Sequence, residues 1–449
     1  MKTIIVGGSH GGVAAAKTLK VLAPDMEVLL IEKSRMISYV SSSINLYFEK
    51  YLSDLSQGHL NDPETLEDMG IRVLTEHCAS KIDCEKQQVF YYKVHQKENI
   101  LVESYDYLIL AMGSSPFNTD MNDQELENIL TYKSFEESRI ALQKIQEAQK
   151  ITIVGAGYIG LELSSALKSE KKDLQVVDML DAPLFRYLDS ELTKHLLDHQ
   201  PPYVHLYLNS TVTGFSGNDG KVTKTILMDR ELENDLVIFA INGRPNSELL
   251  QDEIKLNYDG TVAVNAFLQT SDPKVYAIGD MISTAIGDDN YTYITLVSNA
   301  LMTGRIAAEN ICFDNRIPFE QANQTTISKI WGIYIGTSGL TEELAPFYNY
   351  DPVGFTRKFY DHAFEKDYKE IEVKLVFDRT STRLIGGQFL ASFQNFDLIN
   401  LISLMISQKM TPTDILTSDF FYNAHVSSYE NYIADIATNA LQYFFKEKV

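Results

Sequence analysis

Two glycine-rich turns of the same kind, at residues 7–12 and 155–160, constrain the fold of this chain more than any other feature. Each turn follows a short apolar segment and leads through a helix-favouring segment to a second apolar segment. That second segment ends on an acidic residue, Glu32 in the first copy and Asp178 in the second. This order predicts a βαβ unit with a pyrophosphate at the helix N-terminus and a ribose on the carboxylate. One unit is weak evidence, whereas two form an internal repeat and predict two bound dinucleotides.

The first turn departs from the usual pattern at its middle position. Gly7 and Gly12 stand where a tight turn and close packing of helix on strand need glycine, but Ser9 replaces the middle glycine. A phosphate must therefore approach this turn past a Cβ atom. Glu32 is predicted to bind the ribose hydroxyls of the dinucleotide. Lys33, the next residue, is predicted to belong to the same cofactor-binding site.

The second turn is complete, with Gly155, Gly157 and Gly160 all present. Its acidic residue, Asp178, favours the free 2′-hydroxyl of NADH, because a carboxylate repels a 2′-phosphate. No arginine immediately follows Asp178 to receive such a phosphate. A merely structural βα corner would not need this pattern twice in one chain.

Three further glycines follow apolar segments that predict strands. Gly113, Gly243 and Gly279 stand where the chain must turn to leave a strand. Gly279 is followed by Asp280, whose carboxylate can bind a polyol hydroxyl; the alternative is an N-cap for the next segment. The three apolar segments are residues 105–110, 236–241 and 275–278.

The remaining segments divide into an insertion, a connector and a third domain. Residues 71–74 and 89–94 predict strands of a small antiparallel insertion, and residues 117–147 predict a polar, helix-prone connector. After Pro318 the pattern changes to that of an α+β domain. Its expected strands are residues 330–335, 371–377 and 384–390, and its expected helix is 396–408.

Composition excludes several classes of partner and site. The net charge of -22 over 449 residues argues against nucleic acid and against an anionic membrane surface. No long uncharged apolar span predicts a transmembrane helix, and Met1 leads directly into an expected core strand, so we expect no signal peptide. Three cysteines are too few for a disulfide framework and indicate a reducing cytoplasm. Cys78 and Cys84 have no neighbouring cluster at metal-ligand spacing, so we expect no metal site.

Together these motifs resemble the FAD- and NAD(P)H-dependent pyridine nucleotide–disulfide oxidoreductases. The resemblance covers almost the whole chain and is closest to the branch with NADH oxidase, NADH peroxidase and coenzyme A-disulfide reductase. The segments that carry it are residues 7–12, Glu32, 111–113, 155–162, 243–246, 276–280, 336–342 and 419–422.

The resemblance implies an α/β fold with two Rossmann-like nucleotide-binding domains and a C-terminal α+β dimerisation domain. The NAD domain would be inserted in the FAD domain. We expect the FAD domain at residues 1–115 and 246–318, the NAD domain at 116–245 and the dimerisation domain at 319–449. The implied cofactors are FAD and NADH, and the implied assembly is a homodimer.

The resemblance also implies roles for individual residues. Glu32 would bind the adenosine ribose of FAD, and Asp280 a ribityl hydroxyl. Tyr158 and Ile159 would lie over the nicotinamide pocket, with Glu162 on the same side of the flavin. The expected cofactor-binding residues are Gly7, Ser9, Gly12, Glu32, Lys33, Gly113, Gly155, Gly157, Tyr158, Ile159, Gly160, Asp178, Gly243, Gly279 and Asp280.

The chain departs from the family at its redox centre. The family carries a flavin-facing cysteine where this chain has Ser42, followed by Ser43 where the family has glycine. A serine hydroxyl cannot cycle through sulfenic acid or disulfide states, so we expect no disulfide reductase or thiol peroxidase activity. His10 is retained, either as a proton donor over the flavin or as a helix-start residue that packs near FAD without chemistry. His10, Ser42 and Glu162 are the candidate catalytic residues.

Two functions remain open on this evidence. The first is an NADH oxidoreductase that passes electrons to oxygen, giving hydrogen peroxide, or to another small-molecule acceptor. The second is a non-catalytic or regulatory flavoprotein that lost its redox thiol. Nucleotide fingerprints at both sites, the second of them complete, favour the enzyme. His425 stands near a family histidine contributed by the dimer partner, but residues 423–424 depart from the family pattern, so we assign it no role.

Overall fold

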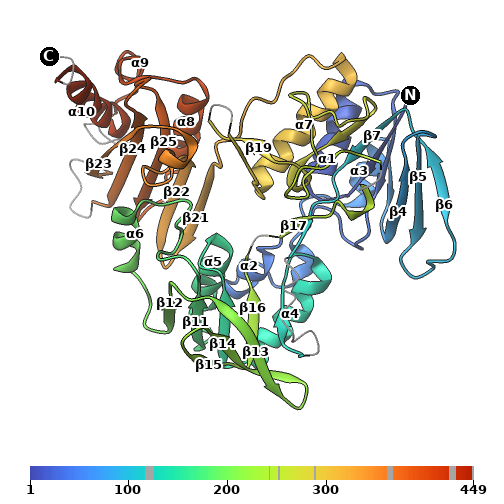
Figure 1. Ribbon diagram of the computed structural model, residues 1–449, viewed down its shortest axis with the longest axis horizontal. Coiled ribbons are helices and arrows are strands. Elements are labelled where there is room, and N and C mark those ends of the chain that lie inside the picture. The colour runs from blue at the N-terminus through green and yellow to red at the C-terminus, as the bar shows by residue number, and fades with distance from the viewer. Residues whose placement is uncertain are drawn as a thin grey trace. The chain divides into compact units, whose positions relative to one another are not determined.

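The computed structural model describes residues 1–116, 126–241, 243–250, 253–287, 290–361, 368–423 and 431–446 (Figure 1). The chain forms two compact units. The first unit comprises Met1–Ala148, Ile241–Ala285 and Tyr291–Glu320, and the second comprises Gln149–Ala240, Ile286–Asn290 and Gln321–Val449. This division leaves the domain boundaries expected from the sequence as a prediction.

The first unit is built on a five-stranded parallel sheet. Strands that are buried on both faces favour continuous apolar residues, which explains the apolar runs at its centre. The strand order is β18-β7-β1-β2-β3. The strands are β1 (Lys2–Val6), β2 (Glu27–Ile31), β3 (Ile71–Leu74), β7 (Tyr107–Leu110) and β18 (Val275–Ala277).

Helices α1 (His10–Leu22) and α7 (Val297–Phe313) pack closely against each other in this unit. A Cβ added to Gly304 of α7 would lie 2.4 Å from the carbonyl oxygen of Gly11, so the helix backbones meet where only glycine fits. The other helices are α2 (Ser43–Phe48), η1 (Leu55–Gln57), α3 (Pro63–Asp68), α4 (Phe135–Glu147), η3 (Glu248–Leu250) and η4 (Gly279–Met281).

The expected antiparallel insertion is present, with one correction. It consists of β4 (His77–Asp83), β5 (Gln88–Lys93) and β6 (Leu101–Ser104), whereas Ile71–Leu74 pairs in parallel with β2 and belongs to the main sheet. The strand belongs to the main sheet because it pairs with β2, and the sequence of residues 71–74 alone does not reveal this pairing. The short strands are β8 (Ser114–Ser115), β9 (Ile129–Leu130), β17 (Arg244–Pro245), β19 (Thr284–Ala285) and β20 (Tyr291–Thr292).

The second unit contains the second βαβ repeat. Four parallel strands run in the order β12-β11-β10-β16, and a three-stranded antiparallel sheet, β13-β14-β15, accompanies them. The elements are β10 (Lys150–Val154), α5 (Tyr158–Ala166), η2 (Leu167–Ser169), β11 (Asp173–Val177), α6 (Ser190–Leu197), β12 (Val204–Tyr207), β13 (Val212–Asn218), β14 (Lys221–Leu227), β15 (Glu231–Glu233) and β16 (Leu236–Phe239).

The C-terminal part of the second unit is a five-stranded antiparallel sheet of order β21-β22-β25-β24-β23. Helix α8 packs on β22 and β25, and α10 on β23 and β24, as can be followed in Figure 1. The elements are β21 (Thr326–Ile330), β22 (Ile333–Gly339), η5 (Ala345–Tyr348), β23 (Pro352–Tyr360), β24 (Glu370–Asp378), β25 (Leu384–Ala391), α8 (Phe396–Ser407), α9 (Pro412–Leu416) and α10 (Tyr432–Lys446).

The single strand expected at residues 330–335 is wrong. The chain reverses there, because Trp331 and Gly332 have φ angles of 50° and 91° and form the two-residue loop between β21 and β22. Two positive φ angles in succession suit the turn that joins two antiparallel strands without splaying them.

Candidate functional site

The first glycine turn requires glycine for steric reasons. Gly7 has a φ of 112°, and a Cβ there would lie 2.1 Å from the carbonyl oxygen of Ala111. A Cβ on Gly12 would lie 1.9 Å from the carbonyl oxygen of Gly7. Ser9 is exposed at the N-cap of α1 and makes no capping hydrogen bond through its side chain. The first N–H groups of α1 therefore remain available to an anion.

Glu32 closes this turn from the end of β2. One carboxylate oxygen accepts a hydrogen bond from the backbone N–H of Gly8 at 2.6 Å, and the other accepts from that of Ser34 at 2.7 Å. Burial raises the pKa of Glu32, and these two hydrogen bonds partly oppose the rise. Lys33 lies exposed beside it and also favours the charged form.

The second turn repeats this arrangement. Asp178 accepts hydrogen bonds from the backbone N–H groups of Ala156 at 2.7 Å and Leu180 at 2.9 Å. A Cβ on Gly160 would lie 2.0 Å from the carbonyl oxygen of Gly155, whereas a Cβ on Gly157 would meet nothing within 4 Å. The turn is thus tight at its base and open at the start of α5, where the fingerprint predicts a pyrophosphate.

Asp280 is the centre of a polar group at a strand end of the first unit. Its Oδ2 accepts a hydrogen bond from the hydroxyl of Ser114 at 2.7 Å and lies 3.0 Å from the ammonium of Lys133. The hydroxyl of Tyr293 donates to the Asp280 carbonyl at 2.9 Å. The N-cap alternative for Asp280 is wrong, because Ile278 holds the N-cap position of η4 and no side chain caps it.

The sequence did not indicate Ser114, Lys133 or Tyr293 as members of this group. Only Ser114 carried a usable signal, because it directly follows the turn at Gly113, whose φ of 69° favours glycine. Gly243 fits close to the same segment, since a Cβ there would lie 1.9 Å from the carbonyl oxygen of Ser115.

His10 lies close to Asp280 and to the segment that carries Ser42. Burial lowers the pKa of His10, and the Asp280 carboxylate and a hydrogen bond to the backbone of Tyr39 oppose this effect. Ser42 is half-buried at the N-cap of α2 and makes no capping hydrogen bond through its side chain. The structure therefore places His10 within electrostatic reach of Asp280 and in contact with the segment between β2 and α2.

Ser43, the residue after Ser42, has its side chain inside the protein. Ser43 is fully buried, and its hydroxyl donates to the carbonyl of Gly58 at 3.3 Å. The three cysteines of the chain, Cys78, Cys84 and Cys312, are free and lie on or directly after β4 and on α7. Burial raises the pKa of Cys84 to about 11 and also raises that of Cys312, so both favour the unreactive thiol.

Helix α5 presents the side chains expected beside the nicotinamide. Ile159 is 44% exposed, whereas the Tyr158 ring meets the Tyr187 ring edge-on at 4.7 Å between centroids. Burial raises the pKa of Tyr158. Glu162 accepts a hydrogen bond from the hydroxyl of Ser328 at 2.6 Å. The predicted places of these residues beside nicotinamide and flavin stay predictions.

The other expectations about sites concern histidine, metal and membrane. His425 lies outside the described residues, and Tyr422 nearby is 55% exposed. Within the described parts of the chain, no group of three His, Cys, Asp or Glu side chains could hold a metal ion. Over the same residues, no helix combines the length and apolar character needed to cross a bilayer.

Comparison with known proteins places this geometry among flavoenzymes. Residues 1–304 match the family described as pyridine nucleotide-disulphide oxidoreductase, and residues 328–430 match its dimerisation domain. An NADH oxidase from Streptococcus pyogenes is 31% identical over 98% of this chain and 99% of its own length. An NADH oxidase from Enterococcus faecalis is 30% identical over 98% of this chain and 100% of its own.

Two solved structures share the fold. A pyridine nucleotide-disulfide family oxidoreductase from Enterococcus faecalis has a TM-score of 0.88 at 28% identity, covering 99% of this chain and 100% of the other. A water-forming NADH oxidase from Lactobacillus brevis bound to NADH has a TM-score of 0.94 at 24% identity, covering 100% of both chains.

Proposed function

The chain belongs to the pyridine nucleotide-disulphide oxidoreductase family and is an FAD-dependent NADH oxidoreductase, and we propose that it delivers two electrons to oxygen and releases hydrogen peroxide. The observation that carries this proposal is the serine at position 42, where the resemblance to the family implies a redox thiol.

The residues of the first unit fit FAD. The uncapped start of α1 would receive its pyrophosphate, Glu32 its adenosine ribose, and Asp280 with Lys133 its ribityl hydroxyls. In the second unit, the open start of α5 and Asp178 would hold NADH. When bound, the FAD would accept a hydride from NADH and supply electrons to the acceptor.

The identity of the product depends on what can reduce peroxide further. Two electrons convert oxygen to hydrogen peroxide, and water formation needs two more from a second donor. A cysteine at position 42 would be such a donor, because a thiolate takes up an oxygen atom as sulfenic acid. Ser42 cannot, and neither Cys84 nor Cys312 is poised to do so, because burial favours their thiol forms.

His10 would supply a proton to the reduced oxygen. It lies at the first turn of α1, hydrogen-bonded to the Tyr39 backbone and within electrostatic reach of the Asp280 carboxylate. A side chain in this position can act as a general acid when it is protonated. The pH dependence of kcat/KM for oxygen distinguishes this role from the alternative, in which His10 only packs near FAD.

The test is the amount of oxygen consumed per NADH oxidised, with and without catalase. Peroxide formation consumes one oxygen per NADH, and catalase returns half of it. Consumption of half an oxygen per NADH, with no effect of catalase, would mean that water is the product and that the argument from the missing thiol is wrong. The non-catalytic alternative is tested by mixing with NADH without air, because it requires an unchanged flavin spectrum.

Assembly and compartment complete the proposal. Residues 319–449 would form a homodimer interface, supported by the matched dimerisation domain and by large exposed apolar side chains such as Phe347, Phe396 and Leu404. Light scattering at micromolar concentration tests it, and a stable monomer would contradict it. Three free cysteines support a reducing, cytoplasmic compartment.

A further inference from the structure

One face of α5, the helix that begins at the NADH fingerprint, is held by the β21–β22 hairpin. The hydroxyl of Tyr158 lies 3.3 Å from that of Thr337 on β22, and Glu162 accepts from Ser328 on β21 at 2.6 Å. Ser165 accepts a hydrogen bond from the backbone N–H of Trp331 at 3.0 Å. Positions 158, 162 and 165 are spaced by four and three residues and therefore share one face of the helix.

The tip of this hairpin, Trp331, makes a second contact with the helix. Its indole Nε1–H donates to the hydroxyl of Ser164 at 3.0 Å. Ser164 is fully buried, and its own proton goes to the carbonyl of Leu161 at 2.7 Å. The Ser164 hydroxyl thus acts as acceptor and donor at once, and it fixes the indole to the C-terminal half of α5.

The backbone of Trp331 indicates that this contact is not incidental. A φ of 50° is unfavourable for a bulky residue, and two-residue hairpin loops of this kind favour asparagine or glycine at that position. Strained residues of this sort persist only where the surroundings hold them. Here the surroundings are the two hydrogen bonds from Trp331 to α5.

We propose that Trp331 is a positioning residue for NADH. Through Ser164 and Ser165 it sets the orientation of α5, and with it the N-terminal turn at residues 157–160 that receives the dinucleotide. The C-terminal sheet thereby takes part in nucleotide binding although it contributes no residue to the fingerprint. This inference rests on the proposed function, because it assumes that NADH binds at α5.

The test compares W331F, which keeps an aromatic ring but loses the Nε1–H, with S164A, which loses the acceptor. Each should raise the KM for NADH about threefold to tenfold, the effect of one lost hydrogen bond, with kcat and FAD content unchanged. S164A also loses the bond that Ser164 donates to the Leu161 carbonyl, so the double variant is compared with S164A: adding W331F should raise the KM no further, because the indole bond is already absent there. Y334F is the matched control: Tyr334 lies on β22 but packs against Phe396 of α8, so its KM should stay at the wild-type value.

The outcomes separate this inference from the proposed function. If W331F lowers the melting temperature but leaves the KM for NADH unchanged, Trp331 has only a structural role and the inference fails. Additive effects of W331F and S164A on KM would also overturn it. If NADH does not bleach the flavin of the wild-type protein, the proposed function itself fails.

Discussion

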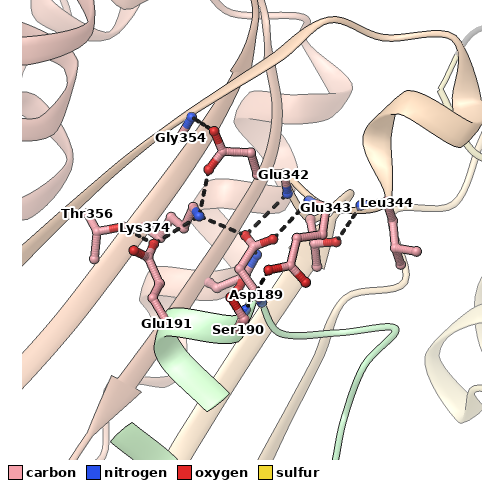
Figure 2. A network of polar contacts seen from close by, with 11 residues as sticks. Asp189, Ser190, Glu191, Glu342, Glu343, Leu344, Gly354, Thr356 and Lys374 are labelled. Carbon is pink, nitrogen blue, oxygen red and sulfur yellow. Dashed lines mark hydrogen bonds and ion pairs between the residues drawn. The ribbon is translucent and has the colours of Figure 1, made fainter. Parts of the chain in front are cut away.

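The ammonium of Lys374 lies 3.1 Å from a carboxylate oxygen of Asp189, with the two side chains only 5% and 2% exposed (Figure 2). Asp189 directly precedes α6, and Lys374 lies in the middle of β24. Two further carboxylates reach the same ammonium, Glu342 at 2.7 Å and Glu191 at 2.9 Å. The contact therefore fastens the start of α6 to the C-terminal sheet of the second unit.

Removing this ammonium should destabilise the protein strongly. Burial alone would lower the pKa of Lys374, but the surrounding carboxylates outweigh it and raise the pKa, so the lysine is charged at neutral pH. In K374M the Asp189 carboxylate stays buried without its cation, and the expected loss is about 3–5 kcal/mol of unfolding free energy. Urea unfolding of wild type and K374M, prepared with the same FAD content, measures this loss of unfolding free energy.

The matched control for K374M is K358M on the neighbouring strand β23. Lys358 pairs with Glu370 at 2.9 Å, but the two side chains are 52% and 38% exposed. A surface pair of this kind contributes under about 1 kcal/mol. Equal unfolding midpoints for the two variants would show that the buried group carries no special stability.

Asp178 should make the protein prefer NADH. We expect kcat/KM to favour NADH over NADPH by about 1–3 kcal/mol, because a 2′-phosphate would face this carboxylate. D178N removes the negative charge of the Asp178 carboxylate while keeping a side chain of similar volume. It should therefore reduce the ratio of kcat/KM for NADH to kcat/KM for NADPH. It should also weaken NADH binding, because Asp178 holds the turn through Ala156 and Leu180. Equal kcat/KM values for the two nucleotides in the wild type would reject the assignment.

Placing a thiol at position 42 should change the product of oxygen reduction. In S42C the consumption of oxygen per NADH should fall from one towards one half, and the effect of catalase should fade. Ser43 need not be changed first, because its side chain is turned to Gly58 in the protein interior. S42A is the control and should still give peroxide. If both S42C and S42C/S43G carry a titratable thiol yet form only peroxide, position 42 does not decide the product.

The pH dependence should identify the role of His10. Burial depresses the pKa of His10 below its ordinary value of 6.5, so the side chain is mostly neutral at pH 7. If it donates a proton, the kcat/KM for oxygen should rise as the pH falls below 6.5, and H10Q should lose this rise. A wild-type profile that matches that of H10Q would assign His10 to packing alone.

The same depressed pKa has a consequence for stability. The unfolded chain binds a proton at His10 more readily than the folded chain does. The contribution of neutral His10 to the free energy of unfolding is therefore present above pH 6.5, and it is lost as the pH falls through the folded-state pKa of His10. Wild type should therefore lose stability relative to H10Q over that range, which thermal unfolding at a series of pH values can follow.

The two repeats could be predicted from the sequence because their glycines are required by local backbone conformation and by close contacts inside each βαβ unit. Gly7 and Gly155 both adopt positive φ angles, and each βαβ unit appears where expected. The hairpin at Trp331 was missed for the opposite reason. A tryptophan in a left-handed turn has no local signal, because its position is determined by contacts with α5, which is distant in sequence.

The candidate site divides in the same way. Glu32 and Asp178 could be named because they end the second strand of a recognisable unit. Lys133 could not, because its partner Asp280 is distant in the chain and only folding brings the two together. The ion pair of Lys374 with Asp189 could not be predicted for the same reason, because the two residues belong to no shared sequence motif.

The hairpin tip also gives the protein a single optical reporter. Trp331 is the only tryptophan in the chain, so indole emission arises at one place, against α5 in the second unit. The yellow colour of bound FAD would report on the first unit instead. Loosening of α5 and release of the flavin can therefore be followed as two separate signals in one unlabelled sample.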